Sequence, residues 1–259
     1  MPSAPHAPRN WFDCGGRAYA RFRPEYPPEL ARYLAHASPS RELAVDLGCG
    51  SGQFSTRLAD EFAEVIACDP SAEQLTSAPV RAGLRYIRAS AEAVPLPDHC
   101  ASLVSAAQAA HWFDLPAFYA EARRIARRDA LIALVSYGVP RLEEGLQARF
   151  DRFYHDEIGP WWPSERKRVD NGYRDMPFPF IELEAPPFEI RTSWRLDDFL
   201  GYVSTWSAVK RLRETGNDGV IAGFANELAV LWGEPATVRP ISWPISMRLG
   251  TAAHLQAAE

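Results

Sequence analysis

The chain has 259 residues, of which 47% are hydrophobic, which is enough for one large domain or for one domain with an insertion. Its net charge of −5 argues against nucleic acid as a partner, because domains that bind nucleic acid usually present a basic surface. No apolar run approaches the roughly 20 residues that span a bilayer, and the first ten residues lack the apolar region of a signal peptide. We therefore expect no membrane partner.

The four cysteines are scattered along the chain and form no C-x-x-C pair. This usage favours neither a zinc site nor a disulfide framework, and it suits the reducing conditions of the cytoplasm. No other cluster has the spacing of metal ligands, so no metal is expected.

Residues 43–54, with the sequence LAVDLGCGSGQF, form the strongest motif in the chain. An apolar run leads to Asp46, and Gly48, Gly50 and Gly52 follow before a helical repeat of apolar residues. Glycine is needed where the backbone takes positive φ or where a ligand touches the main chain, and the start of the next helix offers free N–H groups. The motif predicts a nucleotide-type site, although a tight turn without a ligand is the alternative. Its D-x-G-x-G-x-G spacing differs from the dinucleotide pattern G-x-G-x-x-G.

Segments typical of strands and helices alternate as far as residue 138, which implies an open parallel sheet. After the first strand, further strands are predicted at residues 65–69, 84–89, 102–107 and 130–137. Ligands of such sheets bind beyond the carboxyl ends of the strands. The residues predicted at those ends are Asp46, Asp69, Ser90 and Gln108.

Asp69 follows Gly48 by 21 residues, at the end of the second predicted strand. An acid at this place can accept hydrogen bonds from both hydroxyls of a ribose. The alternative is a turn residue without a ligand, but the distance from the glycines favours ligand binding.

The pattern changes in the second half of the chain. Residues 139–187 are rich in proline, tryptophan and phenylalanine, and we expect them to form a helical and irregular cap, or lid, over the strand ends. Residues 188–259 are expected to complete the sheet and the cap with two alternating strands and two helices, the first helix running from Asp197 to about Glu214. Pro244 interrupts the last strand, so either the paired strand begins after it or a bulge absorbs it.

From about Tyr19 onward the chain resembles the class I S-adenosylmethionine (SAM) dependent methyltransferases. Within them it is similar to the methyltransferase type 11 group and to relatives of trans-aconitate methyltransferase. The shared features are the glycine motif and Asp69, joined by Tyr19, Arg23-Pro24-x-Tyr26-Pro27, His111-Trp112, Asp170-x-Gly172-Tyr173 and Pro177-Phe178-Pro179-Phe180.

The resemblance implies an α/β fold, in which a Rossmann-like, doubly wound sheet of seven mostly parallel strands has its last strand antiparallel and carries a cap. Together with the change of pattern after residue 138, the resemblance divides the chain into a tail at residues 1–18, a SAM-binding core at 19–138, a cap at 139–187 and a C-terminal part at 188–259. It also implies methyl transfer from SAM, with S-adenosylhomocysteine (SAH) as the product.

A set of cofactor-binding residues follows from the motifs and the strand ends. The set is Tyr19, Arg23, Asp46, Gly48, Cys49, Gly50, Gly52, Asp69, Pro70, Ser90, Ala91, Glu92 and Gln108. Within it, Arg23 can pair with the carboxylate of the methionine part.

For the acceptor we expect a small acidic or polar metabolite methylated on oxygen. The sequence after the fourth strand lacks the N-P-P-Y signature of amino methyltransferases acting on bases, and the cap holds basic residues among aromatic ones. The candidate substrate residues are His111, Trp112, Tyr173 and Arg168.

His111 is also the candidate catalytic residue, as a base or as a hydrogen-bond donor, with packing against Trp112 as the alternative. A carboxylate acceptor would need no base, whereas a phenol or an alcohol would give a rate that depends on a pKa near 6–7. Two further functions stay open at this point, a SAM-binding protein without catalysis and an oxidoreductase with a nucleotide cofactor. The sequence does not indicate an oligomeric state.

Overall fold

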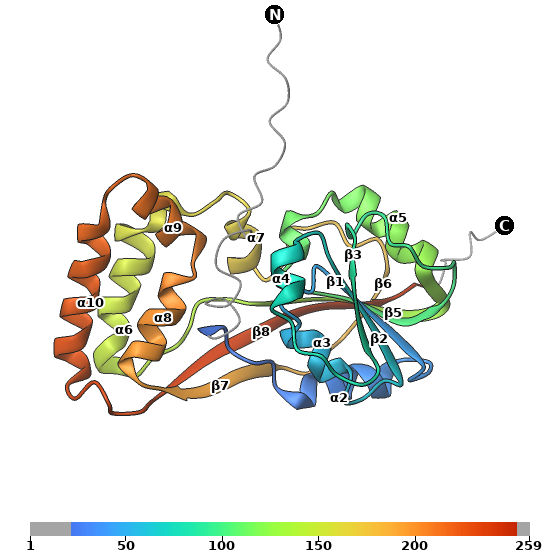
Figure 1. The fold of residues 1–259 in the computed structure, drawn as a ribbon, viewed down its shortest axis with the longest axis horizontal. Coiled ribbons are helices and arrows are strands. Elements are labelled where there is room, and N and C mark those ends of the chain that lie inside the picture. The colour runs from blue at the N-terminus through green and yellow to red at the C-terminus, as the bar shows by residue number, and fades with distance from the viewer. Residues whose placement is uncertain (1–21, 253–259) are drawn as a thin grey trace, which may run out of the picture.

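The structure is a computed structural model, which describes residues 22–252 (Figure 1). Its centre is a single sheet of five parallel strands in the order β3-β2-β1-β4-β5, followed by the antiparallel strand β8. Helices connect β1 to β2, β2 to β3 and β4 to β5, whereas the described residues between β3 and β4 contain no helix. The bounds are β1 Leu43–Leu47, β2 Glu64–Asp69, β3 Leu84–Arg88, β4 Ala101–Ala107, β5 Ala126–Tyr137 and β8 Arg239–Thr251. The predicted Rossmann-like α/β fold with an antiparallel last strand is confirmed.

The outer edge of the sheet differs from the expected seven strands. Two short strands, β6 (Ile181–Leu183) and β7 (Phe188–Trp194), both pair with β8, one at each end of it. Eight strands therefore occupy seven positions. The segment between β6 and β7 contains Pro186 and Pro187, which cannot donate ladder hydrogen bonds, and this explains why the edge strand is divided.

The last strand contains Pro244 without a break. Its register against β7 runs continuously from Arg239 to Ile245, so both expectations for this proline are wrong. Ser242 exchanges backbone hydrogen bonds with Arg141 on the side away from β7. Residues two apart turn their N–H groups to the same side of an antiparallel strand, so the nitrogen of Pro244 faces that side too. β5 ends there at Tyr137, opposite Ile245, and no ladder bond is lost.

Helices cover both faces of the sheet, because alternate residues of each strand point to opposite faces. On one face α2 (Pro28–Ala37) and α3 (Gln53–Leu58) pack against strand residues such as Ala44 and Leu103. On the other face α5 (Leu115–Ile125) packs against residues such as Val45. Asp114 caps α5, as its side chain accepts a hydrogen bond from the backbone of Ala117.

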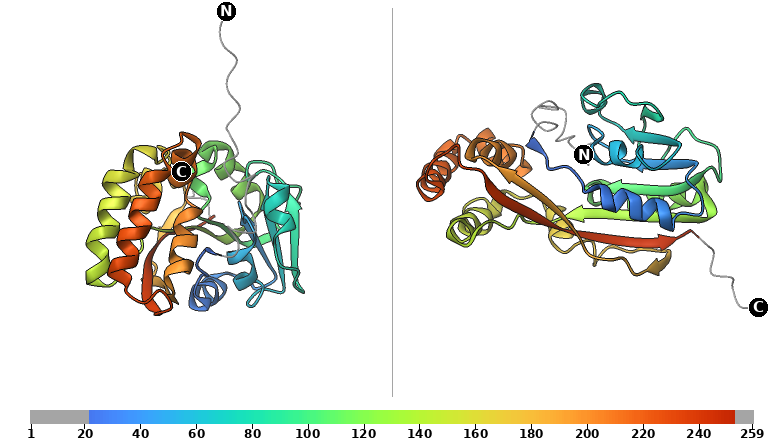
Figure 2. Two further views of the ribbon diagram at one scale, coloured as in Figure 1. Left: turned by 60° about the vertical axis from the view of Figure 1, so that its left-hand side comes forward. Right: turned by 90° about the horizontal axis from the view of Figure 1, so that it is seen from below.

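Four helices gather at one end of the molecule, where β7 and β8 extend beyond the rest of the sheet (Figures 1 and 2). They are α6 Glu144–Arg152, α8 Leu196–Ser204, α9 Ser207–Glu214 and α10 Asp218–Trp232, and the π-helix η2 Phe153–Glu157 and the 3-10 turn η3 Gly159–Trp161 contact this group. α7 Arg166–Asp170 lies nearer the parallel strands, in contact with β5 and the 3-10 turn η1 Ala110–Trp112, and α4 Ala72–Thr76 packs beside β2 and β3. The helix predicted from Asp197 to Glu214 is broken at Thr205 and Trp206 into α8 and α9. Aromatic rings fill the interior, for example Phe153 stacked on Phe224 at 3.8 Å between centroids.

Candidate active site

The turn after β1 places its three glycines in the left-handed region of the backbone, with φ of 67°, 56° and 83°. A Cβ on Gly48 would lie 2.5 Å from the Cβ of Ala109, and one on Gly52 would collide with the hydroxyl of Tyr86. A Cβ on Gly50 would meet only Gln74, at 3.9 Å. Packing therefore requires glycine at 48 and 52, whereas Gly50 leaves the main chain open to a ligand.

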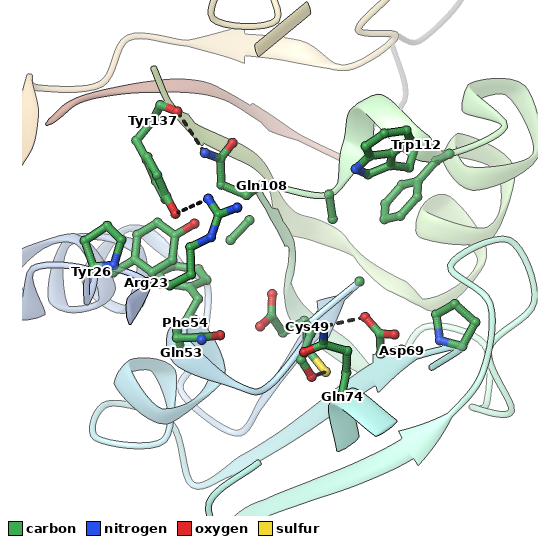
Figure 3. A pocket seen from close by; sticks show the side chains of 18 residues that line it. Arg23, Tyr26, Cys49, Gln53, Phe54, Asp69, Gln74, Gln108, Trp112 and Tyr137 are labelled. Atoms are coloured by element: carbon green, nitrogen blue, oxygen red, sulfur yellow. Dashed lines mark hydrogen bonds between the residues drawn. The ribbon is translucent and has the colours of Figure 1, made fainter. Parts of the chain in front are cut away.

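This open main chain forms part of a first cavity at the carboxyl ends of the strands, shown in Figure 3. The cavity encloses about 820 Å³, part of it open to solvent, which is in the range of small-molecule sites. Nine predicted site residues line it: Arg23, Asp46, Gly48, Cys49, Gly50, Asp69, Pro70, Gln108 and Trp112. The other lining residues were not predicted as site residues, although Pro24 and Tyr26 belong to a shared family motif: Pro24, Tyr26, Gln53, Phe54, Gln74, Ala107, Ala109, Phe113 and Tyr137.

Asp69 ties the end of β2 to the glycine turn. One carboxylate oxygen accepts the backbone N–H of Gly50 at 2.9 Å, and the other accepts that of Ser71 at 2.8 Å. Each carboxylate oxygen has two lone pairs. The same oxygens can therefore accept further hydrogen bonds from a ligand while they hold the turn in place.

Asp46 lies fully buried at the base of the first cavity. Its carboxylate accepts hydrogen bonds from the hydroxyls of Ser55 at 2.6 Å and Ser105 at 2.9 Å. Burial raises the pKa of Asp46 to about 6, although the two hydroxyl groups act against that rise. At pH above 7 the carboxylate is mostly ionised, and together with Asp69 it makes the first cavity suited to a ligand that carries positive charge.

Some predicted cofactor residues do not line the first cavity. Ser90, Ala91 and Glu92 form a turn in which the hydroxyl of Ser90 donates to Glu92, and Glu92 accepts the backbone N–H of Asp114 at 3.0 Å. This turn is thus fastened to the start of α5, and its contact with a cofactor stays a prediction. Tyr19 lies outside the described residues.

A second cavity adjoins the first and shares Arg23, Gln108 and Trp112 with it. Its other lining residues are His111, Trp162, Pro163, Arg166, Val169, Thr205, Trp206, Ser207 and Lys210. Three lining side chains are cationic and three carry indole rings, and no carboxylate is among the described residues that line it. The second cavity is therefore suited to a negatively charged molecule with an apolar body.

Arg166, on α7, is held by three contacts. Its Nε donates to the hydroxyl of Tyr154 and to the carboxylate of Asp170, each at 2.9 Å. Its guanidinium carbon lies 4.9 Å from the ring centroid of Trp162, a cation–π contact. These contacts fix the guanidinium at the wall of the second cavity before any ligand arrives.

His111 lies at the inner wall of the second cavity and is buried. Its Nδ1 is 2.9 Å from the hydroxyl of Tyr173, and its ring lies 4.9 Å from that of Trp112. Burial, assisted by the charges of Arg166 and Arg168, lowers the pKa of His111 to about 3. This shift favours the neutral form of His111 at physiological pH and argues against a titration of this histidine near pH 6–7. The pH-dependent rate expected with a phenol or an alcohol as acceptor stays a prediction.

Tyr173 and Arg168, predicted to contact the substrate, line neither cavity. Tyr173 is fully buried, with a φ of 62°, and holds the ring of His111. Arg168 donates to the backbone oxygen of His111 at 3.4 Å. In this structure both residues position His111, and direct contact with a substrate stays a prediction for them.

Comparison with known proteins decides the family. A family model described as a methyltransferase domain matches residues 45–134. A methyltransferase of Dictyostelium discoideum is 34% identical over 214 residues, which cover 81% of each chain. A solved structure from Anaeromyxobacter dehalogenans, described as a type II methyltransferase, has 46% sequence identity and a TM-score of 0.83, and the match covers 90% of this chain and 99% of the other.

This chain belongs to the class I SAM-dependent methyltransferases. A more distant relative, malonyl-[acyl-carrier protein] O-methyltransferase of Methylococcus capsulatus, is 28% identical over 206 residues, which cover 76% of this chain and 70% of the relative. The narrower similarity of this methyltransferase to trans-aconitate methyltransferase relatives stays a prediction.

The part of the methyltransferase that the structure describes contains no helix long and apolar enough to cross a bilayer. Nor does that part place three or more His, Cys, Asp or Glu side chains where they could hold a metal ion.

Proposed function

We propose that this methyltransferase moves the methyl group of SAM to an oxygen of a small organic acid, with SAM in the first cavity and the acid in the second. The observation that carries the proposal is the pair of adjoining cavities with opposite charge. SAM brings a positively charged sulfonium, which suits the cavity of Asp46 and Asp69. The acid brings a carboxylate, which suits the cavity of Arg166 and Lys210.

Three features of the first cavity fit SAM. The carboxylate of Asp69 lines the cavity, and its oxygens are of the kind that accepts hydrogen bonds from the two ribose hydroxyls. Gly50 leaves room for a ligand against its main chain. Arg23 lines the cavity and offers a guanidinium to the methionine carboxylate.

The second cavity supports an acid as acceptor by its chemistry. Arg166 and Lys210 can hold an anion, and the indoles of Trp112, Trp162 and Trp206 can enclose an apolar body. The relative from Methylococcus capsulatus is by name an O-methyltransferase, which supports oxygen as the receiving atom. Residues 139–187 contribute Arg166 and Trp162, and we propose that they form the cap of this acceptor site.

The reaction needs little proton chemistry from the protein. SAM supplies a methyl group on a positive sulfur, and transfer to a carboxylate oxygen gives an ester and SAH with no proton released. Arg166 and Lys210 would hold the acid, while Trp112, shared by both cavities, would help to exclude water and align the reactants. His111, whose pKa is lowered to about 3, is a poor proton acceptor and serves as a neutral packing and hydrogen-bonding group.

An acceptor panel with isotope-labelled SAM tests the proposal. The panel holds small carboxylic acids, phenols and amines, and the products are separated and treated with mild base, which hydrolyses methyl esters and leaves ethers and N-methyl groups intact. We expect label in base-labile esters of acids. Efficient N-methylation of amines, with no acid or phenol accepted, would overturn the proposal.

A further inference from the structure

Gln108 has a strained backbone at the point where the two cavities meet. It follows β4 directly, and its φ is 54°, in the left-handed region that few residues other than glycine adopt. Its backbone N–H nevertheless donates to the oxygen of Val135 at 2.8 Å, as a continuing strand would. Strain of this kind is kept where the surrounding structure enforces it, and it gathers at functional sites.

The side chain of Gln108 is held by one end only. Its Nε2 donates to the backbone oxygen of Tyr137 at 2.8 Å, and Figure 3 shows the amide nitrogen turned toward Tyr137 and the oxygen turned away. That oxygen, Oε1, is buried and accepts no hydrogen bond within residues 22–252. A buried acceptor without a donor is costly to the fold. Because the bond to Tyr137 fixes the amide, a flip cannot relieve this cost.

We propose that the Oε1 of Gln108 contacts the sulfonium methyl group of SAM and holds it at the point of transfer. This inference rests on the proposed function, which places SAM in the first cavity and the acceptor in the second. Gln108 lines both cavities, and the methyl group has to cross from one to the other. The methyl hydrogens next to a positive sulfur are polarised, and a carbonyl oxygen can accept C–H···O contacts from them.

The contact distinguishes SAM from its product. SAH has lost the methyl group, and its sulfur is neutral, so Oε1 has nothing to hold after transfer. A contact of Oε1 with the amino group of the cofactor would instead be the same in SAM and SAH, since both contain that group. The ratio of the two affinities therefore reports which atoms the oxygen meets.

The test is calorimetric titration of SAM and SAH into wild type and Gln108→Met, which keeps the length of the side chain and removes the amide. We expect SAM affinity to fall about tenfold and SAH affinity to change less than twofold. With saturating SAM, kcat should fall as well, while the KM for the acceptor changes little. Gln53→Met is the matched control, because Gln53 lines the same cavity but not the second one, and any loss there should be equal for SAM and SAH.

Equal weakening of SAM and SAH in Gln108→Met, or no weakening of either, would overturn the inference. If the methionine variant does not fold, Gln108→Asn is the alternative, because it keeps the amide and shortens the side chain by one methylene group. We expect this variant also to lose affinity for SAM and not for SAH. A wild-type protein that binds neither SAM nor SAH would refute the proposed function itself. Binding of both by wild type leaves that function standing whatever the variant does.

Discussion

The two cavities of this methyltransferase are built in different ways. Half of the residues that line the first lie around the glycine turn and the end of β2, and the others come from the N-terminal segment, the end of β4 and Tyr137; its charged groups at the turn are the carboxylates Asp46 and Asp69. The second draws its wall from the N-terminal segment, from the end of β4 and from α7 and α9. Its charged groups are cations.

This difference separates two tasks of the enzyme. A cavity built around a local motif suits a cofactor that every member of the family uses, whereas a cavity whose wall includes helices from the second half of the chain can change with the acceptor. Their opposite charges match the proposed reactants, a sulfonium and a carboxylate. Arg23, Gln108 and Trp112 belong to both walls, so the reactants would meet there.

The largest effect is expected where a side chain is added to the floor of the first cavity. Gly50→Ala would place a methyl group in open space against the cofactor and should weaken SAM binding by about 100-fold or more, through steric conflict and left-handed strain. Gly216→Ala is the control, since Gly216 has a φ of 77°, no neighbour within 4 Å of its Cβ position and no place in either cavity wall. Both variants should lose similar stability in thermal unfolding, and equal SAM binding by both would break the assignment of the first cavity.

Removing a carboxylate from the first cavity should have the next largest effect. Asp69→Ala should weaken SAM binding by roughly 1–3 kcal/mol, because hydrogen bonds to the ribose hydroxyls and the support of the glycine turn are lost together. Calorimetry on the folded variant measures it. An unchanged affinity would show that Asp69 only shapes the turn.

A variant of the second cavity should leave the first unaffected. Arg166→Met should raise the KM for an acid acceptor by about tenfold, since a charge-assisted contact is lost, while SAM affinity stays within twofold. Lys167→Met, on the same helix but exposed and outside both walls, should change neither value. If Arg166→Met weakened SAM and acceptor alike, the two cavities would not be separate binding sites.

The smallest effect on rate concerns His111, because its pKa of about 3 keeps it neutral. With a carboxylic acid as acceptor, kcat should be flat between about pH 6 and 8, and His111→Asn should lower it without introducing a pH dependence. A rate that falls below a pKa near 6–7 in wild type, and not in the variant, would contradict the structure.

The same pKa predicts a stability effect at lower pH. The folded pKa of His111 lies below the ordinary value of 6.5, so the unfolded chain takes up the proton first. Above pH 6.5 this difference is absent, and below it the free energy of unfolding should fall by about 1.4 kcal/mol per pH unit toward pH 3. Asp46, with its pKa raised to about 6, acts in the opposite direction between about pH 4 and 6. The measurement is urea unfolding of wild type and of His111→Asn across this pH range, and the contribution of Asp46 cancels because both proteins contain it. If the free energy of unfolding depended on pH in the same way for both proteins, the low pKa of His111 would be refuted.

The sequence predicted the first cavity well and the second poorly, for a physical reason. Strand, glycine turn and helix are local sequence patterns. Because the carboxyl ends of neighbouring parallel strands lie at the same edge of the sheet, the proximity of Asp46, Asp69 and Gln108 could be predicted from the sequence. The apolar periodicity also indicated most of the strands. The role of Gly52 and the position of the Ser90–Glu92 turn depended on packing against Tyr86 and α5, which no local pattern records.

The second cavity depends on contacts across the whole chain. Lys210 and Trp206 reach it because the helix predicted from Asp197 to Glu214 breaks, and no spacing in the sequence places α9 beside the strand ends. The pKa of His111 is lowered by its burial and by charges from distant segments. Neither burial nor those neighbours can be read from the residues around His111.

A crystal structure with SAH and a small organic acid bound together is the most direct test of two adjoining sites of opposite charge. We predict SAH in the first cavity with its ribose hydroxyls on Asp69, and the acid in the second with its carboxylate held by Arg166 and Lys210. The sulfur should face the acid at the place where the two cavities meet, beside Arg23, Gln108 and Trp112. An acid bound outside the second cavity, or a sulfur turned away from that place, would show that the two cavities do not hold the reactants in this way.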